Sequence, residues 1–175
     1  IMKTLRLIGT ILLMVVLCLN FTACGDDDDD DIDVSQLEGT WGLTHSAGWR
    51  LEETEKYEWD YTCDPYNPDS SEHECEKLVI KKLTDNTYSV AAYYYNGSEW
   101  RTHSSQTLTL NGNILTVSQT NGDYGYFESY ANLTIETLTA ENLAIRVKYD
   151  NVQTVPEYNP DRRDSTDYTD TFVRM

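Results

Sequence analysis

Apolar and polar residues alternate along short stretches of this chain, and this pattern limits the possible folds more than any other feature. Successive side chains of a β-strand point to opposite faces, so alternation indicates strands with one buried face. The clearest case is 143–150, where every second residue is apolar: Leu143, Ile145, Val147 and Tyr149. The same spacing predicts further inward pairs: Leu133 and Ile135, Tyr88 and Val90, and Leu108 and Leu110.

Turn sequences rich in Asn, Asp, Gly and Ser separate these stretches. They lie at 84–86, 96–98, 111–112, 120–123 and 139–142. The segments between them predict eight strands: 39–45, 78–83, 87–95, 100–110, 113–119, 126–137, 143–150 and 168–174. We therefore predict an all-β fold, an eight-stranded antiparallel up-and-down β-barrel, because closure removes free strand edges. Whether 54–62 forms an extra strand stays open.

The first 23 residues are organised like a bacterial export signal. The basic residues Lys3 and Arg6 precede the apolar run 7–19, which is too short to span a bilayer. The run ends in Phe21-Thr22-Ala23-Cys24, which resembles the lipobox of bacterial lipoproteins. The resemblance implies cleavage before Cys24 and lipid attachment to its sulfur. An ordinary secretory signal followed by an incidental cysteine is the alternative.

A short acidic tether, residues 24–36, follows the leader. It contains six consecutive Asp, 26–31, and like charges repel one another and keep such a segment extended. The run after Cys24 is similar to the acidic tag that sends Bacteroidetes lipoproteins to the outer face of the cell. That resemblance implies an outer-membrane protein facing the cell exterior.

The net charge of the chain is −17, and losing Lys3 and Arg6 with the leader leaves −19. So acidic a protein is not expected to bind nucleic acid. Anionic lipid would also repel it, so membrane attachment is expected to depend on Cys24 alone. The remaining roughly 140 residues fit one domain, 37–175.

The four cysteines have three expected fates. Cys18 is discarded with the leader and Cys24 carries the lipid, which leaves Cys63 and Cys75 as an even pair. In an oxidising compartment such a pair predicts a disulfide. A metal site formed with His73 is the alternative, but it lacks a fourth ligand.

Several short motifs resemble the lipocalin-like domains of Bacteroidetes lipoproteins. They are the early Gly39-x-Trp41 step, the hairpin at 110–113, Leu138-Thr139 before Leu143, and a last strand that ends in Arg174. The resemblance implies a lipocalin-like barrel that binds a small ligand. It also implies a structural role for Gly39, and packing of Trp41 against Arg174 at one end.

No enzymatic, cofactor or metal motif accompanies these features. The three histidines have no Ser, Cys or acidic partner at a spacing typical of a catalytic triad or a metal site. No glycine-rich loop joins a strand to a helix, as a phosphate site would require. We therefore expect a binding protein rather than an enzyme, without a cofactor.

In an up-and-down barrel successive connections alternate between the two ends. The tight turns at 84–86, 111–112 and 138–142 then share one end, which we call the closed end. The longer segments 46–77, 96–99, 120–125 and 151–167 share the other, which we call the mouth. The first strand starts at the closed end, so the tether leads there and the mouth is expected to face away from the membrane.

Polar and aromatic side chains near the mouth are the candidate ligand-binding residues. The strand pattern points these inward: His45, Tyr94, Trp100, Thr102, Ser104, Phe127, Ser129 and Tyr149. Two Tyr-Asn-Pro-Asp loops add Tyr66 and Tyr158. Aromatic faces and hydroxyls suit an amphipathic or sugar-like ligand. The alternative is a barrel with a solid core that contacts a glycan or a protein through its mouth loops.

Overall fold

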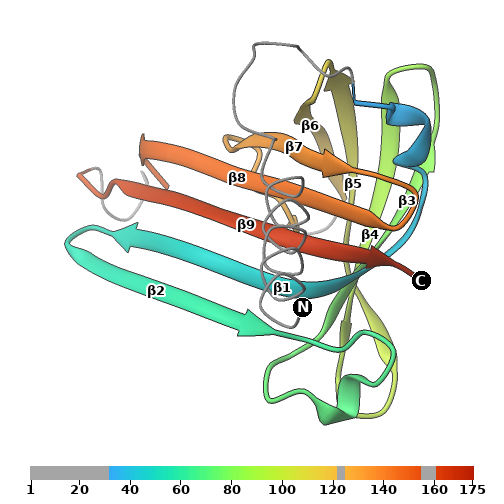
Figure 1. Ribbon diagram of the computed structural model, residues 1–175. Coiled ribbons are helices and arrows are strands. Elements are labelled where there is room, and N and C mark those ends of the chain that lie inside the picture. The colour runs from blue at the N-terminus through green and yellow to red at the C-terminus, as the bar shows by residue number, and fades with distance from the viewer. Residues whose placement is uncertain (1–31, 122–124, 155–160) are drawn as a thin grey trace, which may run out of the picture. The chain divides into compact units, whose positions relative to one another are not determined.

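A computed structural model describes residues 32–121, 125–154 and 161–175 (Figure 1). The predicted leader, Cys24 and the six Asp lie outside the described residues, and so does Tyr158. Within the described part, no helix has the length and apolar character needed to cross a membrane.

The described residues form nine strands and two single-turn helices. The strands are β1 Gly39–Glu52, β2 Glu55–Thr62, β3 Glu76–Lys82, β4 Thr87–Tyr95, β5 Trp100–Asn111, β6 Ile114–Asn121, β7 Asn132–Leu138, β8 Asn142–Val152 and β9 Asp164–Arg174. The 3-10 helices are η1 Val34–Gln36 and η2 Pro68–Ser70. The all-β prediction is confirmed.

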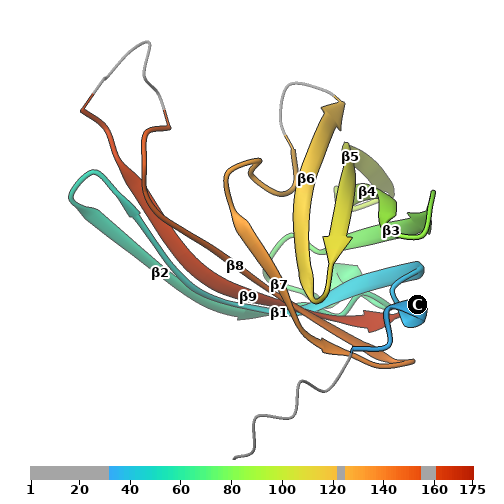
Figure 2. The same ribbon diagram turned by 90° about the horizontal axis from the view of Figure 1, so that it is seen from above.

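An eight-stranded antiparallel ring closes through the first and last strands. Strands β1, β3, β4, β5, β6, β7, β8 and β9 pair in that order, and β9 pairs back onto β1 from Arg174 opposite Trp41 to Asp164 opposite Glu52. Figure 2 shows β1, β2, β8 and β9 running side by side and extending beyond β3, β4, β5 and β6. The predicted up-and-down barrel is confirmed.

The segment 54–62, which was left unassigned from the sequence, contains strand β2. It pairs with His45–Glu52 of β1, whereas β3 pairs with Gly39–Gly42, and both run antiparallel to β1. Strands β2 and β3 therefore lie end to end along one edge of β1 and together fill one position of the barrel. Because β2 and β3 count as one strand of the barrel, the connections still alternate between its two ends as predicted.

The predicted disulfide joins the two strands that share this position. Cys63 follows β2, Cys75 precedes β3, and their Cα atoms are 5.7 Å apart in the bonded pair. Closing a loop of this size stabilises the fold by about 3 kcal/mol, mainly by restricting the unfolded chain. Because both sulfurs are used in the bond, the alternative metal site with His73 is excluded.

Trp41 and Arg174 pack together at the closed end. Trp41 is completely buried, and its indole Nε1 donates a hydrogen bond to the Leu37 carbonyl at 2.9 Å. The Arg174 guanidinium lies 4.2 Å from the Trp41 ring centre and donates to the carbonyls of Gln36, Glu38 and Ala140. One side chain thus ties the segment before β1 to the turn between β7 and β8.

The inward positions predicted from alternation form the core. All ten are at most 6% exposed: Tyr88, Val90, Leu108, Leu110, Leu133, Ile135, Leu143, Ile145, Val147 and Tyr149. Trp41, Leu43 and Phe172 extend this core toward the closed end. Period two therefore identified the buried face correctly in these strands.

The predicted strand 126–137 is wrong in its first half, because β7 begins only at Asn132. The preceding residues form a loop that the Gln106 side chain holds in place. Its amide Nε2 donates to the Phe127 carbonyl at 2.7 Å, and its Oε1 accepts from the Phe127 N–H at 2.8 Å. These two bonds satisfy the backbone that a neighbouring strand would otherwise have paired, and Phe127 is buried in the core.

Candidate functional site

A pocket of about 300 Å³ lies inside the barrel, on the mouth side of the core. It is lined by Ser46, Arg50, Trp59, Tyr61, Glu76, His103, Tyr126, Glu128, Val147, Tyr149, Thr166, Tyr168 and Asp170. This volume is at the lower limit of pockets that bind small organic molecules. The pocket is partly open to solvent, and buried side chains fill the core below it.

Side chains from four adjacent strands form one wall of the pocket. The strand registers place them in rows across β2, β1, β9 and β8: Tyr61, Ser46 and Asp170; Trp59, Gly48, Tyr168 and Val147; and Arg50, Thr166 and Tyr149. Within the middle row the Trp59 and Tyr168 ring centres are 5.4 Å apart. A Cβ on Gly48 would lie 2.3 Å from the Cβ of Tyr168, so only glycine lets Tyr168 approach β1 this closely.

The opposite wall carries His103 from β5, and Tyr126 and Glu128 from the loop before β7, while Glu76 extends the first wall from β3, which continues the line of β2. The Tyr126 hydroxyl links the two walls, because it donates to Asp170 Oδ2 at 3.2 Å and also hydrogen-bonds with Glu76. Two carboxyl groups from different strands thus meet at one phenol.

Both carboxyl groups are held in a poorly solvated environment. The pKa of Glu76 is raised to about 7, chiefly by burial; the Asp170 and Glu74 carboxyls contribute to the rise, and a hydrogen bond with Tyr126 opposes it. Burial also raises the pKa of Asp170 to about 6, although hydrogen bonds with Ser46 and Tyr126 favour its charged form. Desolvation disfavours a carboxylate that lacks a cationic partner.

The cationic groups near the pocket do not neutralise these two carboxyls. Arg50 places its Nε 2.9 Å from Glu52 Oε1 and a second nitrogen 3.8 Å from Asp164 Oδ2. In the described part of the chain, no Lys, Arg or His nitrogen comes within 4.0 Å of a carboxylate oxygen of Glu76 or Asp170. The pocket is therefore aromatic and acidic.

A second hollow, of about 490 Å³, lies outside the barrel between β2 and the segment 63–75. Most of its lining residues are exposed: Asp60, Thr62, Asp64, Ser70, Glu72 and His73. It contains no completely buried polar group that could orient a ligand, and the interior pocket is the stronger site. No cluster of three metal-binding side chains occurs among the residues that the structure describes.

Some predicted ligand-binding residues lie at or beside the pocket. Tyr149 lines it and packs edge-on against Tyr130, with ring centres 5.0 Å apart. Tyr94 packs edge-on against the pocket residue His103. Phe127 points inward as predicted but belongs to the core below the pocket. Ser104 is also buried, whereas Ser129 is exposed.

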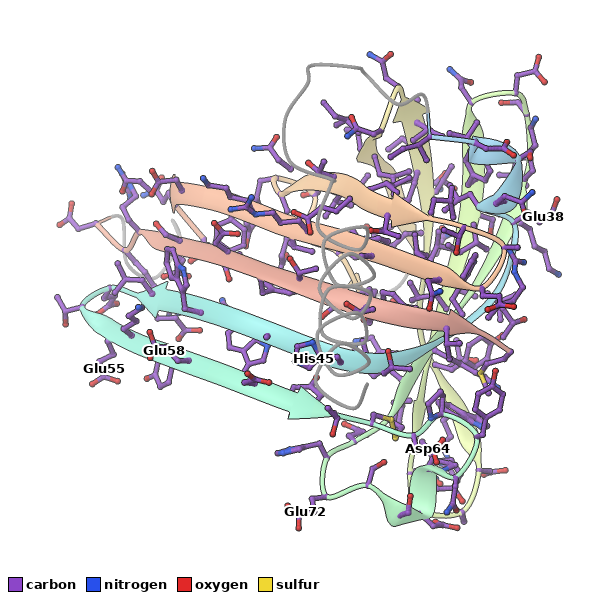
Figure 3. All side chains as sticks on the ribbon, viewed as in Figure 1. Glu38, His45, Glu55, Glu58, Asp64 and Glu72 are labelled. Atoms are coloured by element: carbon purple, nitrogen blue, oxygen red, sulfur yellow. A yellow bond between two sulfur atoms is a disulfide. The ribbon has the colours of Figure 1, made fainter. Side chains whose placement is uncertain are left out.

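Two predicted inward residues, His45 and Thr102, face outward because of β-bulges. An extra residue, Thr44, interrupts the pairing of β1 with β9, so Ser46 takes the inward position and His45 turns toward Asp60 on β2 (Figure 3). His103 is the extra residue of β5 opposite β4, and Thr102 pairs with Tyr93 on the outer face. One inserted residue reverses the face of those beyond it.

Trp100 and Tyr66 are also outside the pocket. Trp100 lies on the outer surface beside Tyr95, and Lys77 Nζ is 4.4 Å from its ring centre. The Tyr66 hydroxyl donates to the Arg174 carbonyl at 2.6 Å, so Tyr66 lies at the closed end rather than at the mouth. The connection between β8 and β9 begins after Val152 and ends before Asp164, and these two residues pair with each other. Asp164 also pairs with Glu52, the last residue of β1, so this connection starts and ends at the opposite end of β1 from Trp41.

Most of the pocket residues were not predicted from the sequence, although two patterns in it point to them. Tyr57, Trp59 and Tyr61 alternate with acidic residues, which is a strand signal. In β9 Asp170 occupies an inward position between Tyr168 and Phe172, where a charged side chain is unusual. No local pattern marks Glu76 or Tyr126, because their role depends on the opposite wall.

Comparisons with known proteins identify no family for this chain. No family model matches it, and no curated protein matches it. Among solved structures it is similar to the siderocalin Ex-FABP, a protein described as functioning through dual ligand specificities. The TM-score is 0.47 at 8% sequence identity, over 80% of this chain and 74% of that one. The chain is thus characterised by its own architecture, a closed eight-stranded antiparallel barrel with a polar aromatic pocket inside it.

Proposed function

We propose that this domain binds a small molecule in the interior pocket. The pocket itself supports this proposal most directly: it is about 300 Å³ in volume and is lined by four aromatic side chains of the strands and by polar groups from both walls. Convergent polar groups among aromatic surfaces orient a ligand, while the aromatic surfaces supply binding area. An amphipathic or sugar-like molecule fits this description.

Native mass spectrometry of the protein purified from the cells that make it tests this proposal. We expect a co-purifying molecule with the wild-type protein. Thr166→Phe should abolish it, because Thr166 is 1% exposed and lines the pocket, so a larger side chain fills the space. Thr169→Phe, on the outward face of the same strand, is the matched control and should retain the molecule.

A Thr166→Phe protein that retained the co-purifying molecule would contradict binding in the pocket. A wild-type protein that carries no molecule, and whose pocket residues show no NMR shifts with neutral or charged fragments, would contradict it as well. The alternative is a surface module that contacts a glycan or a protein. The aromatic cluster of Tyr93, Tyr95 and Trp100 on the outer face favours this alternative. If binding occurs at that surface, the Thr166→Phe change should have no effect on it.

We also propose that a lipid on Cys24 anchors the protein in the outer membrane, with the mouth directed to the cell exterior. Support comes from the lipobox-like sequence before Cys24, from the acidic tag after it, and from the charge of −17, which disfavours adsorption to anionic lipid. The described chain enters β1 at the closed end, whereas the pocket lies toward the mouth.

Replacing Cys24 with Ser is expected to release the protein from the membrane fraction, because acylation supplies the only proposed attachment. Fractionation of cells that express either form measures this. Protease treatment of intact cells tests the outward orientation, since only a surface-exposed domain is accessible. A Cys24→Ser protein that stays in membranes after leader removal would refute the anchor.

A further inference from the structure

We propose that the ligand of the interior pocket carries a cation, an organic ammonium or amidinium group that binds between Glu76 and Asp170 while its apolar body contacts Trp59 and Tyr168. This inference rests on the proposed ligand-binding function and narrows it to one chemical class. It comes from the arrangement of acidic and aromatic groups on the two walls.

The hydrogen bonds at Tyr126 show why a cation fits. A phenol has one proton, and the Tyr126 hydroxyl donates it to Asp170 Oδ2. Glu76 also hydrogen-bonds with this hydroxyl, and that bond favours the charged form of its carboxyl, so one phenol proton serves two carboxyl groups. A bound ammonium can take over this position, because it donates to both carboxylates and supplies the missing positive charge.

The aromatic wall matches the rest of such a ligand. Trp59 and Tyr168 present their rings next to the carboxyls, and the Trp59 Nε1–H is already used by the Ser46 hydroxyl at 2.9 Å. The rings are therefore available for apolar and cation–π contacts rather than for hydrogen bonding. Asp170 is 4% exposed, so a cation that reaches it is largely removed from water, which strengthens the attraction.

The surrounding charges support the same class. Arg50 lines the described pocket and forms ion pairs with Glu52 and Asp164, although its buried Nε makes no well-oriented hydrogen bond. The other charged or titratable groups around the two carboxyls are His45, Tyr61, Glu74, His103, Glu128, Tyr149 and Tyr168. Burial raises the pKa of Tyr61, Tyr149 and Tyr168, so these phenols stay neutral. An anionic ligand would meet unfavourable charge.

Three probes with one shared body test the inference: 2-phenylethylamine, 2-phenylethanol and 3-phenylpropanoate. Isothermal titration calorimetry should give roughly tenfold or greater preference for the amine over the alcohol, and no binding of the acid. Affinity for the amine should rise between about pH 5 and about pH 8, because ionised carboxyls bind it and the amine stays charged throughout. Below about pH 7, titrations in buffers of different ionisation enthalpy should show proton release with the amine only.

Two variants locate the effect at the proposed groups. Glu76→Gln and Asp170→Asn should each lower affinity for the amine roughly tenfold or more and leave the alcohol unchanged. Asp85→Asn removes the same charge from an exposed turn at the closed end and should change neither. His103→Gln should preserve the pH response, which separates the carboxyls from the histidine of the same pocket.

The alcohol binding as tightly as the amine would overturn the inference and leave the proposed ligand-binding function intact. Amine affinity that survives both carboxyl substitutions would overturn it too. If millimolar amine causes no NMR shift of the pocket residues, the inference that the ligand is a cation is also contradicted. Ligand binding itself is rejected only if, in addition, no molecule co-purifies with the protein. Circular dichroism of each variant checks folding, which the loss of a buried charge should not impair.

Discussion

Raising the pH from about 4 to about 8 is expected to lower the free energy of unfolding of the unliganded domain by roughly 3 kcal/mol or more. The pKa of Asp170 rises from 3.8 to about 6 on folding, and that of Glu76 rises from 4.5 to about 7. Between the unfolded and folded values the native state binds more protons, so stability falls as pH rises. This contribution is complete at low pH and lost above about pH 7.

Urea denaturation across this pH range measures the effect. A Glu76→Gln, Asp170→Asn double variant should show a much flatter profile and should be more stable than the wild-type domain near pH 8, because no buried carboxylate then forms. Asp167 has the opposite effect on stability, because its hydrogen bonds with Arg146 lower its pKa. This contribution is lost only as the pH falls below the ordinary aspartate pKa of 3.8, outside the pH range of this measurement. Equal stability of the wild-type domain at both ends of the range would show that the pocket carboxyls are well solvated.

Replacing Trp41 with Ala is expected to destabilise the domain by about 3 to 5 kcal/mol, the usual cost of truncating a large buried aromatic side chain. Trp41 is completely buried, and the change also removes the hydrogen bond to Leu37 and the ring beneath Arg174. A loss of this size is a large part of the total stability of an ordinary domain. Chemical denaturation with intrinsic fluorescence measures it.

Trp100→Ala is the matched control, because it removes the same side chain from the outer surface. We expect it to cost about 1 kcal/mol, the value of an exposed cation–π contact, here with Lys77. Similar losses for the two variants would mean that the closed end does not depend on Trp41. Arg174→Lys provides a further check, since a single ammonium cannot reach the three carbonyls that the guanidinium binds.

The two predictions assign different tasks to the two ends of the barrel. At the closed end, Trp41 and Arg174 stabilise the fold through complete burial and satisfied hydrogen bonds. Toward the mouth, Glu76 and Asp170 are expected to destabilise the empty domain once they ionise, because their charges lack a cationic partner. A group that costs stability without a ligand and would be neutralised by one is expected at a binding site.

The amino-acid sequence by itself determined the buried faces of the unbroken strands and the positions of the tight turns. Alternation identified Leu143 to Tyr149 and the other core positions, because the face of a strand residue depends only on its count along an unbroken strand. Turn residues located the hairpins, including Gly112, whose φ of 60° favours glycine. The even cysteine pair predicted the bond between Cys63 and Cys75, which the structure contains.

Only the tertiary structure decided which side chains form the pocket. The bulges at Thr44 and His103 reverse the faces of β1 and β5, and a bulge depends on pairing with a partner strand rather than on local sequence. The end-to-end placement of β2 and β3 brings Trp59 beside Tyr168, and Gln106 holds the loop that presents Tyr126 to Asp170. These contacts join residues far apart in the chain, so their geometry follows from closure of the barrel and not from any local pattern.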